Sequence, residues 1–161
     1  MDIYKADKDD VGLIARLVGE SNKDVAIRFN LNINNNPKHP SFYTADWAKS
    51  DFERGEEYFI AQQNGEPMGC VAYESADDSL SYLNRLSVLT KYRRRGVGEK
   101  LVKKVIEYSK KNGKDTVSIG IIANFTELKN WYVKLGFVEG ETRSFQHLPF
   151  DVMYLSYRIE D

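Results

Sequence analysis

The stretch from Tyr82 to Ile106 constrains the fold of this chain more than any other. It passes from apolar, β-favouring residues, through a basic turn that contains glycines, into a helical pattern. Val97, Leu101 and Val102 begin the apolar face of that helix, and Asn112-Gly113 marks its end. Backbone amides at a helix start that follows such a turn commonly hold a phosphate group. The stretch therefore predicts a strand, a phosphate-binding turn and a helix.

The rest of the chain supplies the other parts of a mixed sheet. A short strand over 2–5 precedes helices over 7–18, 23–29 and 44–54, and a later helix ends at Gly136. Asn64-Gly65 joins strands 58–62 and 68–74 in a hairpin, and further strands are predicted over 81–89, 116–122, 137–145 and 152–159. Strand, helix, strand over 81–122 implies a parallel pair, whereas the hairpins imply antiparallel neighbours. With no linker or internal repeat, residues 1–161 are predicted to form one α+β domain.

The apolar pattern slips within the strand over 81–89. Leu83 lies at an odd position, whereas Leu86 and Val88 lie at even ones, so strict alternation fails near Asn84-Arg85. A β-bulge would let all three apolar side chains face one core, and it would splay this strand from its neighbour. The alternative is a strand that is buried on both faces, which has no need to alternate.

Composition excludes several classes of function. The net charge is −1, from 23 basic and 24 acidic side chains, so the chain has no overall attraction to nucleic acid or to an anionic membrane. Cys70 is the single cysteine, and we interpret it as a buried, inert thiol. With two histidines besides, no zinc-binding spacing exists, and no metal is expected. Without an apolar signal segment or membrane-length run, we expect a cytoplasmic protein.

The basic turn over 93–98 reads Arg-Arg-Arg-Gly-Val-Gly. Arginines add donors that suit phosphate oxygens, and glycines let the backbone approach a ligand. Leu101 occupies the place of the third glycine of a dinucleotide-binding fingerprint, and the Lys-Ser/Thr ending of a P-loop is missing. On the turn alone, a solvated basic loop explains these residues as well as a phosphate site does.

Two motifs together resemble a known family. The stretch LNRLSVLTKYRRRGVGEKLV resembles the central motif of the GNAT acyltransferases, a superfamily of N-acetyltransferases, through Arg93, Gly96 and Gly98. The later stretch NFTELKNWYVKLGF resembles the same family through Asn124, the helix that carries Tyr132, and the Leu-Gly-Phe ending. The resemblance runs in matching order over about residues 58 to 159.

The resemblance implies a GNAT fold in three αβα layers, with a mixed sheet of about seven strands that splays at two central parallel strands. Acetyl-CoA would bind in that splay. The backbone of 86–88 would pair with the pantetheine arm, the turn would hold the pyrophosphate, and an asparagine side chain would bind the arm. The implied cofactor-binding residues are Leu86, Ser87, Val88, Arg93, Arg94, Arg95, Gly96, Val97, Gly98 and Asn124.

The resemblance also implies direct attack of an amine on the thioester, polarised by the Val88 amide. Tyr132 would protonate the departing thiolate, and its alternative role is that of a packed core aromatic. Many family members carry a glutamate that acts as the general base, and Tyr82 occupies its strand position in this chain. Either a more distant carboxylate then acts through water, with Glu74 on the neighbouring strand as the candidate base, or the proton leaves to solvent. The alternative for Glu74 itself is an exposed strand-end carboxylate.

Acceptor contacts in this family come from the first helices and the last strands. In this chain the family pattern implies four acceptor-binding residues: Arg28, His39, Tyr43 and His147. The alternative for each is a residue that only packs between helices or lies exposed at the surface. Dimers are common in the family, and the aromatic C-terminal strands are a candidate homodimer interface.

The sequence therefore predicts an acetyl-CoA-dependent N-acetyltransferase that acts on a primary amine of a small molecule or peptide. The alternative is a non-catalytic acyl-CoA-binding or sensing module, which the missing glutamate at Tyr82 favours and the retained Tyr132 opposes.

Overall fold

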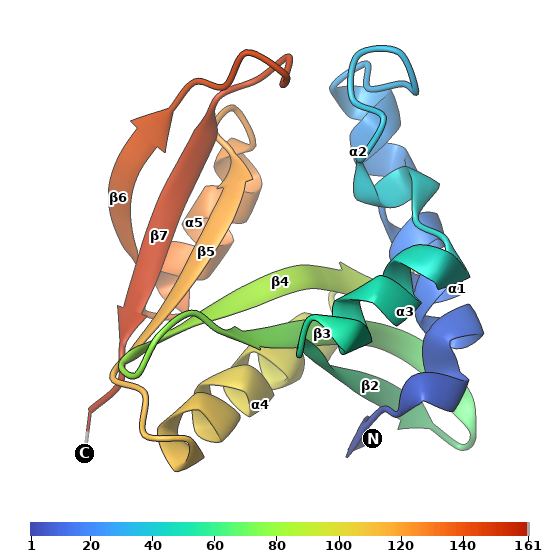
Figure 1. The fold of residues 1–161 in the computed structure, drawn as a ribbon, viewed down its shortest axis with the longest axis vertical. Helices are drawn as coiled ribbons and strands as arrows, with labels where there is room; N and C mark the ends of the chain where they lie inside the picture. Colours follow the sequence, from blue (N-terminus) through green and yellow to red (C-terminus); the bar gives the residue numbers. More distant parts are fainter. Residues whose placement is uncertain (161) are drawn as a thin grey trace.

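One seven-stranded mixed sheet forms the frame of the protein (Figure 1). The computed structural model describes residues 1–160, and the strands follow the order β1-β2-β3-β4-β5-β7-β6 across the sheet. Only β4 and β5 run parallel, and every other neighbouring pair is antiparallel. The strands are β1 (Asp2–Lys5), β2 (Glu57–Gln63), β3 (Glu66–Ser75), β4 (Leu80–Val88), β5 (Thr116–Ile122), β6 (Val138–Arg143) and β7 (Val152–Arg158).

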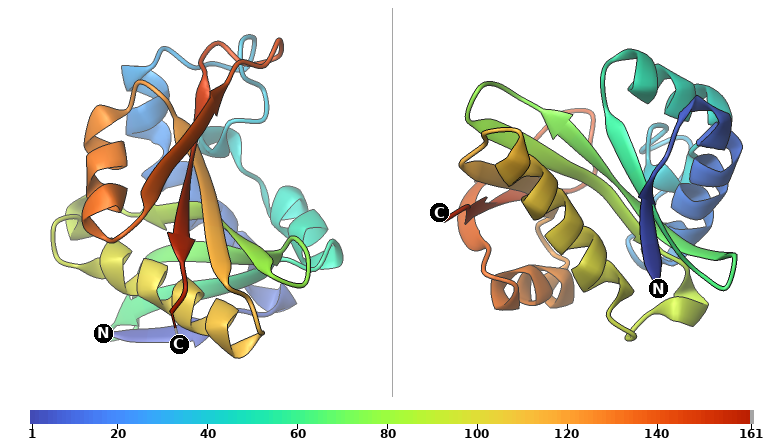
Figure 2. Two further views of the ribbon diagram at one scale, coloured as in Figure 1. Left: turned by 90° about the vertical axis from the view of Figure 1, so that its left-hand side faces the viewer. Right: turned by 90° about the horizontal axis from the view of Figure 1, so that it is seen from below.

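Helices cover both faces of this sheet and give three layers (Figures 1 and 2). They are α1 (Val11–Ser21), α2 (Lys23–Arg28), α3 (Ala45–Glu53), α4 (Val97–Lys111) and α5 (Thr126–Lys134). Helices α1 and α3 enclose a core on one face, with Leu17, Ala48 and Ile60 among its buried residues. Helices α4 and α5 enclose a larger core on the opposite face, which includes Leu101 and Phe137. The predicted αβα arrangement is confirmed.

The turn and capping residues seen in the sequence lie at the observed ends of helices and strands. Asn64 and Gly65 both have positive φ angles, of 53° and 78°, as the turn of a two-residue hairpin requires. Thr44 caps α3 by accepting the Trp47 amide at 3.2 Å. The predicted first helix divides in two, because Asp7 caps a short 3-10 helix, η1 (Lys8–Asp10), that leads into α1. Further 3-10 turns occur at η2 (Pro40–Phe42) and η3 (Thr90–Tyr92).

The predicted bulge in β4 is confirmed. Arg85 has a φ angle of 51°, and the register between β3 and β4 shifts between Cys70 and Ala72. Leu83 and Leu86 both pack in the core beneath α4. The two residues between these leucines are therefore free to face the other side of the sheet.

The sheet splays between β4 and β5. Pairing is limited to Leu80–Tyr82 against Thr116–Ser118, near the start of both strands. Beyond Tyr82 the two strands diverge, and Figure 1 shows β5 and β7 rising away from β4. The divergence leaves the C-terminal half of β4 with a neighbour on one edge only. No helix among residues 1–160 has the length and hydropathy of a membrane span.

Candidate active site

Two adjoining cavities occupy the region where β4 and β5 diverge. The first has a volume of about 500 Å³ and the second about 330 Å³. Five residues line both cavities and form a neck between them: Asn22, Val25, Leu86, Phe125 and Leu128. The neck is largely apolar and is built from α1–α2 on one side, α5 on the other and β4 beneath.

The first cavity gathers most of the predicted cofactor-binding residues. Its lining includes Leu86, Ser87, Val88, Arg93, Arg94, Gly96, Val97 and Gly98. Arg95 and Asn124 are not part of this lining, although Phe125, the neighbour of Asn124, is. The end of β4 and the basic turn therefore line the same cavity.

The turn before α4 has the backbone conformation of an anion-binding loop. Arg94 and Gly96 adopt left-handed φ angles of 64° and 80°, which turn successive amides toward one side. Gly98 has a different reason to be glycine, because a Cβ there would lie 3.2 Å from the Trp131 ring of α5. The helix start can thus pack closely against α5 while its amides stay open to the cavity.

The Arg93 side chain is held by protein groups. Its Nε donates to the Val88 carbonyl at 3.0 Å, one Nη donates to Asp24 at 2.6 Å, and the other donates to the Ser21 carbonyl at 2.5 Å. Burial alone would raise the pKa of Asp24, but the hydrogen bonds and charge of Arg93 bring it below its ordinary value. Arg93 thus joins the end of β4 to the α1–α2 junction.

A buried hydroxyl lies beside this clamp. Ser21 is 3% exposed and lines the first cavity. Among the described residues, its Oγ is the one buried side-chain polar atom that has no hydrogen-bond partner. Unpaired buried polar groups are rare in folded proteins, and a bound ligand is one way to satisfy them.

Tyr132 lines the second cavity from α5. It is 4% exposed, and its ring is held between Trp131 and Phe137 at centroid distances of 4.9 and 5.3 Å. Burial raises the pKa of its phenol, so the group carries its proton at neutral pH. Tyr132 therefore packs in the core and also lines a cavity.

His39 lines the same cavity from the loop before η2. Burial lowers the pKa of its imidazole, which favours the neutral ring. The His39 Nδ1 accepts the Ser41 backbone N–H at 3.2 Å, so the neutral ring carries its proton on Nε2. In this arrangement His39 is a hydrogen-bond donor rather than a base.

The other predicted acceptor residues lie outside both linings. Arg28 pairs with Glu127 of α5, with Nη2 donating to Oε1 at 3.0 Å. The Tyr43 hydroxyl lies 2.9 Å from that of Tyr58. His147 stands in the β6–β7 loop, 5.7 Å from the Phe145 ring. Their roles toward an acceptor stay predictions.

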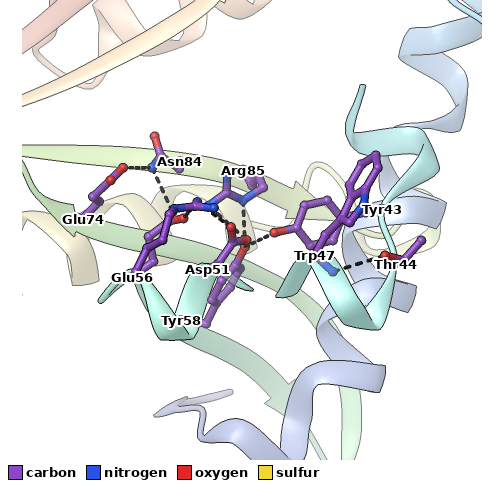
Figure 3. Close-up of polar contacts among 10 residues, drawn as sticks. Tyr43, Thr44, Trp47, Asp51, Glu56, Tyr58, Glu74, Asn84 and Arg85 are labelled. Atoms are coloured by element: carbon purple, nitrogen blue, oxygen red, sulfur yellow. Dashed lines mark hydrogen bonds and ion pairs between the residues drawn. The ribbon is translucent and has the colours of Figure 1, made fainter. Parts of the chain in front are cut away.

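A polar network lies at the bulge of β4 (Figure 3), and sequence reasoning did not predict it. Glu56 is 1% exposed, and both Arg54 and Arg85 bind its carboxylate. Arg85 also donates from Nε to the Tyr58 hydroxyl at 2.7 Å, and that hydroxyl donates to Asp51 at 2.8 Å. Burial raises the pKa of Glu56. The broken alternation near residue 84 was the one signal of this network in the sequence.

The predicted base, Glu74, belongs to the edge of this network. Its Oε1 accepts the Asn84 side-chain amide at 2.9 Å, and the same amide donates to Glu56 at 3.0 Å. Asn84 and Arg85 both line the second cavity, whereas Glu74 does not. Glu74 is therefore one hydrogen bond removed from the cavity lining.

Comparison with known proteins identifies relatives of one kind. The sequence model of the acetyltransferase (GNAT) family matches residues 25–137. N-acetylaspartate synthetase of Danio rerio is 30% identical over 118 residues, covering 66% of this chain and 42% of that protein. An uncharacterized N-acetyltransferase of Methanocaldococcus jannaschii is 30% identical over 106 residues, covering 59% of this chain and 47% of that protein. This chain thus spans less than half the length of these curated relatives.

Solved structures share the fold over nearly the whole chain. An acetyltransferase of the GNAT family from Staphylococcus aureus superposes with a TM-score of 0.74 at 21% identity, covering 99% of each chain. A GNAT family acetyltransferase from Elizabethkingia anophelis with acetyl-CoA bound gives a TM-score of 0.66 at 18% identity, covering 98% of this chain and 97% of that chain. These likenesses establish the fold.

Proposed function

This chain belongs to the acetyltransferase (GNAT) family, and on that premise we propose that it transfers an acetyl group from acetyl-CoA directly to a primary amine of a small molecule or peptide. One observation carries the proposal. A cavity beside a turn with the conformation of an anion-binding loop adjoins, across an apolar neck at Leu86, a second cavity whose lining includes the protonated Tyr132. Donor and acceptor can thus approach each other from opposite sides of the neck.

The first cavity is the proposed site of acetyl-CoA, which supplies an activated acetyl group when it is bound. The left-handed turn at Arg94 and Gly96 offers amides to a pyrophosphate, and the unpaired Ser21 hydroxyl fits a ligand that accepts hydrogen bonds. A related structure that contains acetyl-CoA supports this choice of donor. We propose that Arg93 acts here through the Val88 carbonyl and Asp24, because its side chain is committed to them.

The open edge of β4 supports the proposed role of the Val88 amide. Leu89 donates its amide to the Met68 carbonyl of β3 at 2.9 Å. Successive amides of a strand point to opposite edges, so the Val88 amide faces away from β3, toward the splay. A donor in that position would stabilise the negative charge that develops on a thioester oxygen when an amine attacks the carbonyl carbon.

Proton transfers complete the proposed reaction. The ammonium of the acceptor first gives a proton, through water, to Glu74 as the proposed base, and the free amine then attacks. As the C–N bond forms and the C–S bond breaks, the nitrogen gives a second proton to solvent and the departing thiolate gains the proton of Tyr132. Tyr132 recovers its proton from solvent after the thiol departs. The phenol is the proposed acid because a tyrosine carries its proton at neutral pH; burial raises the pKa of Tyr132, which makes it a weaker acid than a free phenol.

A ligand screen tests the proposed function. The melting temperature of the full chain is measured with acetyl-CoA, with longer acyl-CoA esters and with CoA, and thiol release is then followed with a panel of amines. We expect acetyl-CoA to raise the melting temperature, because a ligand of the native state stabilises it. We also expect at least one amine to accelerate thiol release.

The outcomes separate the rival functions. If no CoA ester stabilises the protein, the whole proposal fails. Stabilisation without thiol release for any amine would instead indicate an acyl-CoA-binding or sensing module, which Tyr82 at the usual glutamate position favours.

A further inference from the structure

We propose that the side-chain oxygen of Asn84 binds the amino group of the acceptor, with Glu56 and Glu74 holding the amide in place. The inference rests on the proposed function, and it assigns a role to a residue that the family motifs leave unassigned. Asn84 lines the second cavity, as Tyr132 does. An amine at that oxygen would thus share a cavity with the proposed acid of the reaction.

The bulge of β4 explains how a polar side chain reaches this place. Leu83 and Leu86 both pack under α4, and the extra residue between them leaves Asn84 and Arg85 on the opposite face. A regular strand would have put residues 84 and 86 on the same face, because side chains alternate. The bulge thus presents two consecutive polar residues to the network of Figure 3.

Two carboxylates fix the orientation of the Asn84 amide. Its Nδ2 donates to Glu74 Oε1 at 2.9 Å and to Glu56 Oε1 at 3.0 Å. Only the NH₂ end of an amide can donate two hydrogen bonds, so the nitrogen and oxygen are assigned by chemistry. The oxygen must then point away from both carboxylates, as Figure 3 shows. No described residue donates a hydrogen bond to this oxygen.

Glu56 is itself immobilised, which makes the arrangement rigid. It is 1% exposed, and its second oxygen accepts Arg54 Nη2 at 2.6 Å, while Arg85 binds the first. Asp51 anchors both arginines in turn, at 2.6 Å from Arg54 and 3.4 Å from Arg85. A binding group held by such a second layer keeps its direction without a substrate.

The chemistry of the amide oxygen suits an amine. It accepts one N–H of the acceptor, and it leaves the nitrogen lone pair free to attack the thioester once a proton has been lost. The two carboxylates behind the amide polarise it and make its oxygen a stronger acceptor. Glu74 holds the nitrogen end of the same amide, so a proton of the acceptor would reach this proposed base through water rather than through the amide.

The test compares Asn84→Leu with the wild-type full chain in steady-state kinetics with acetyl-CoA and the best amine of the panel. Leucine keeps the size of the side chain and removes its oxygen. We expect KM for the amine to rise about 10-fold, the effect of losing one hydrogen bond. The KM for acetyl-CoA and the thermal shift that acetyl-CoA causes are expected to stay unchanged.

A control and a second variant keep the test decisive. Asn112→Leu removes another amide, which donates to the Tyr108 carbonyl at 2.7 Å at the far end of α4, and should leave both KM values unchanged. If Asn84→Leu fails to fold because it does not fit the site, Asn84→Val replaces it, since valine suits a strand and has no acceptor, while Arg54 and Arg85 still bind Glu56.

Each outcome bears on a different claim. A wild-type enzyme that turns over, with an Asn84 variant of equal KM for the amine, overturns this inference alone. Parallel changes in both KM values would show a structural role for Asn84 and would also overturn it. A wild-type chain that neither binds acetyl-CoA nor releases thiol overturns the proposed function, and this inference with it.

Discussion

Tyr132 packs between Trp131 and Phe137 and also lines the second cavity, so its proposed role as the acid can be tested by removing the hydroxyl alone. We predict that Tyr132→Phe lowers kcat by roughly 100-fold, the lower end of the range for a lost general acid. Binding of acetyl-CoA, measured by calorimetry, should stay within about 2-fold, because the ring and its packing remain. Tyr157→Phe is the matched control, since the Tyr157 ring packs at a tilt against Phe137 in the same cluster of rings. Full activity of Tyr132→Phe would disprove the assignment of the acid.

Glu74 can be tested without disturbing its neighbour. In Glu74→Gln the new amide oxygen still accepts the Asn84 hydrogen bond, so the variant removes the capacity to take a proton and little else. If Glu74 is the base, kcat/KM for the amine should fall by roughly 100-fold. Glu66→Gln at the other end of β3 is the control. Unchanged kcat/KM would mean that the amine proton leaves to solvent.

Two buried serines allow a direct comparison of a paired and an unpaired hydroxyl. Ser109 is 0% exposed, and its Oγ lies 2.7 Å from that of Ser81, whereas the Ser21 Oγ has no hydrogen-bond partner among residues 1–160. We predict that Ser109→Ala costs about 1–3 kcal/mol of unfolding free energy, because Ser81 is left unpaired. Ser21→Ala should change it by less than about 0.5 kcal/mol. Denaturant titration of the free protein measures both, and a large loss for Ser21→Ala would contradict this account.

At the scale of elements, the Arg93 clamp joins β4, the basic turn and the α1–α2 junction. Its bond to Asp24 depends on pH, because Asp24 has a pKa below its ordinary value in the folded state. The folded protein then binds fewer protons than the unfolded chain, so the stabilisation is present above the ordinary carboxyl pKa and is lost as pH falls through the folded one.

We predict that Asp24→Asn lowers the unfolding free energy by up to about 1 kcal/mol at neutral pH, as expected for a pair that is partly exposed. The difference from wild type should shrink toward zero in acid, below the folded pKa of Asp24. Asp46→Asn on α3, in the first turn of another helix, is the control. A difference that is constant with pH would show that the clamp does not act through charge.

At the scale of the whole molecule, we propose that the chain is one domain. One sheet runs between the two cores, and β3 contributes to both, with Val71 and Tyr73 in one core and Cys70 and Ala72 in the other. Neither core can be exposed without uncovering a face of the same strands. The two cores are therefore expected to unfold together.

The two tryptophans report on opposite layers, Trp47 on α3 and Trp131 on α5. We predict that Trp47→Phe and Trp131→Phe give fluorescence transitions that coincide with each protein's own circular dichroism transition in denaturant. The wild-type chain, with both reporters, is the control. Separate midpoints for the two methods would show that the layers unfold independently.

The features that the sequence predicted correctly each depend on residues that lie close together in the chain. The hairpin at Asn64-Gly65, the cap at Thr44 and the strand, turn and helix from Tyr82 onward are all confirmed, because turns and caps depend on neighbouring residues. The family was recognised from two such stretches, and the comparison confirms it.

The acceptor side could not be predicted in the same way. Asn84 meets Glu74 and Glu56 across separations of 10 and 28 residues, and Arg93 meets Asp24 across 69. No local pattern marks such partners, since surface and buried carboxylates look alike in a sequence. Arg93 shows the consequence: its motif placed it beside a phosphate site, which stays a prediction, but no local pattern indicated its bonds to Val88 and Asp24.

The sequence by itself determined the family, the order of the elements and the basic turn from Arg93 to Gly98, because each is written in contiguous residues. It also located the irregularity of β4. The tertiary structure alone decided which face that irregularity turns Asn84 toward, and which carboxylates meet it there. The physical reason is that a bulge is a local property of one strand, whereas the partners of its side chains come from strands that the fold brings alongside.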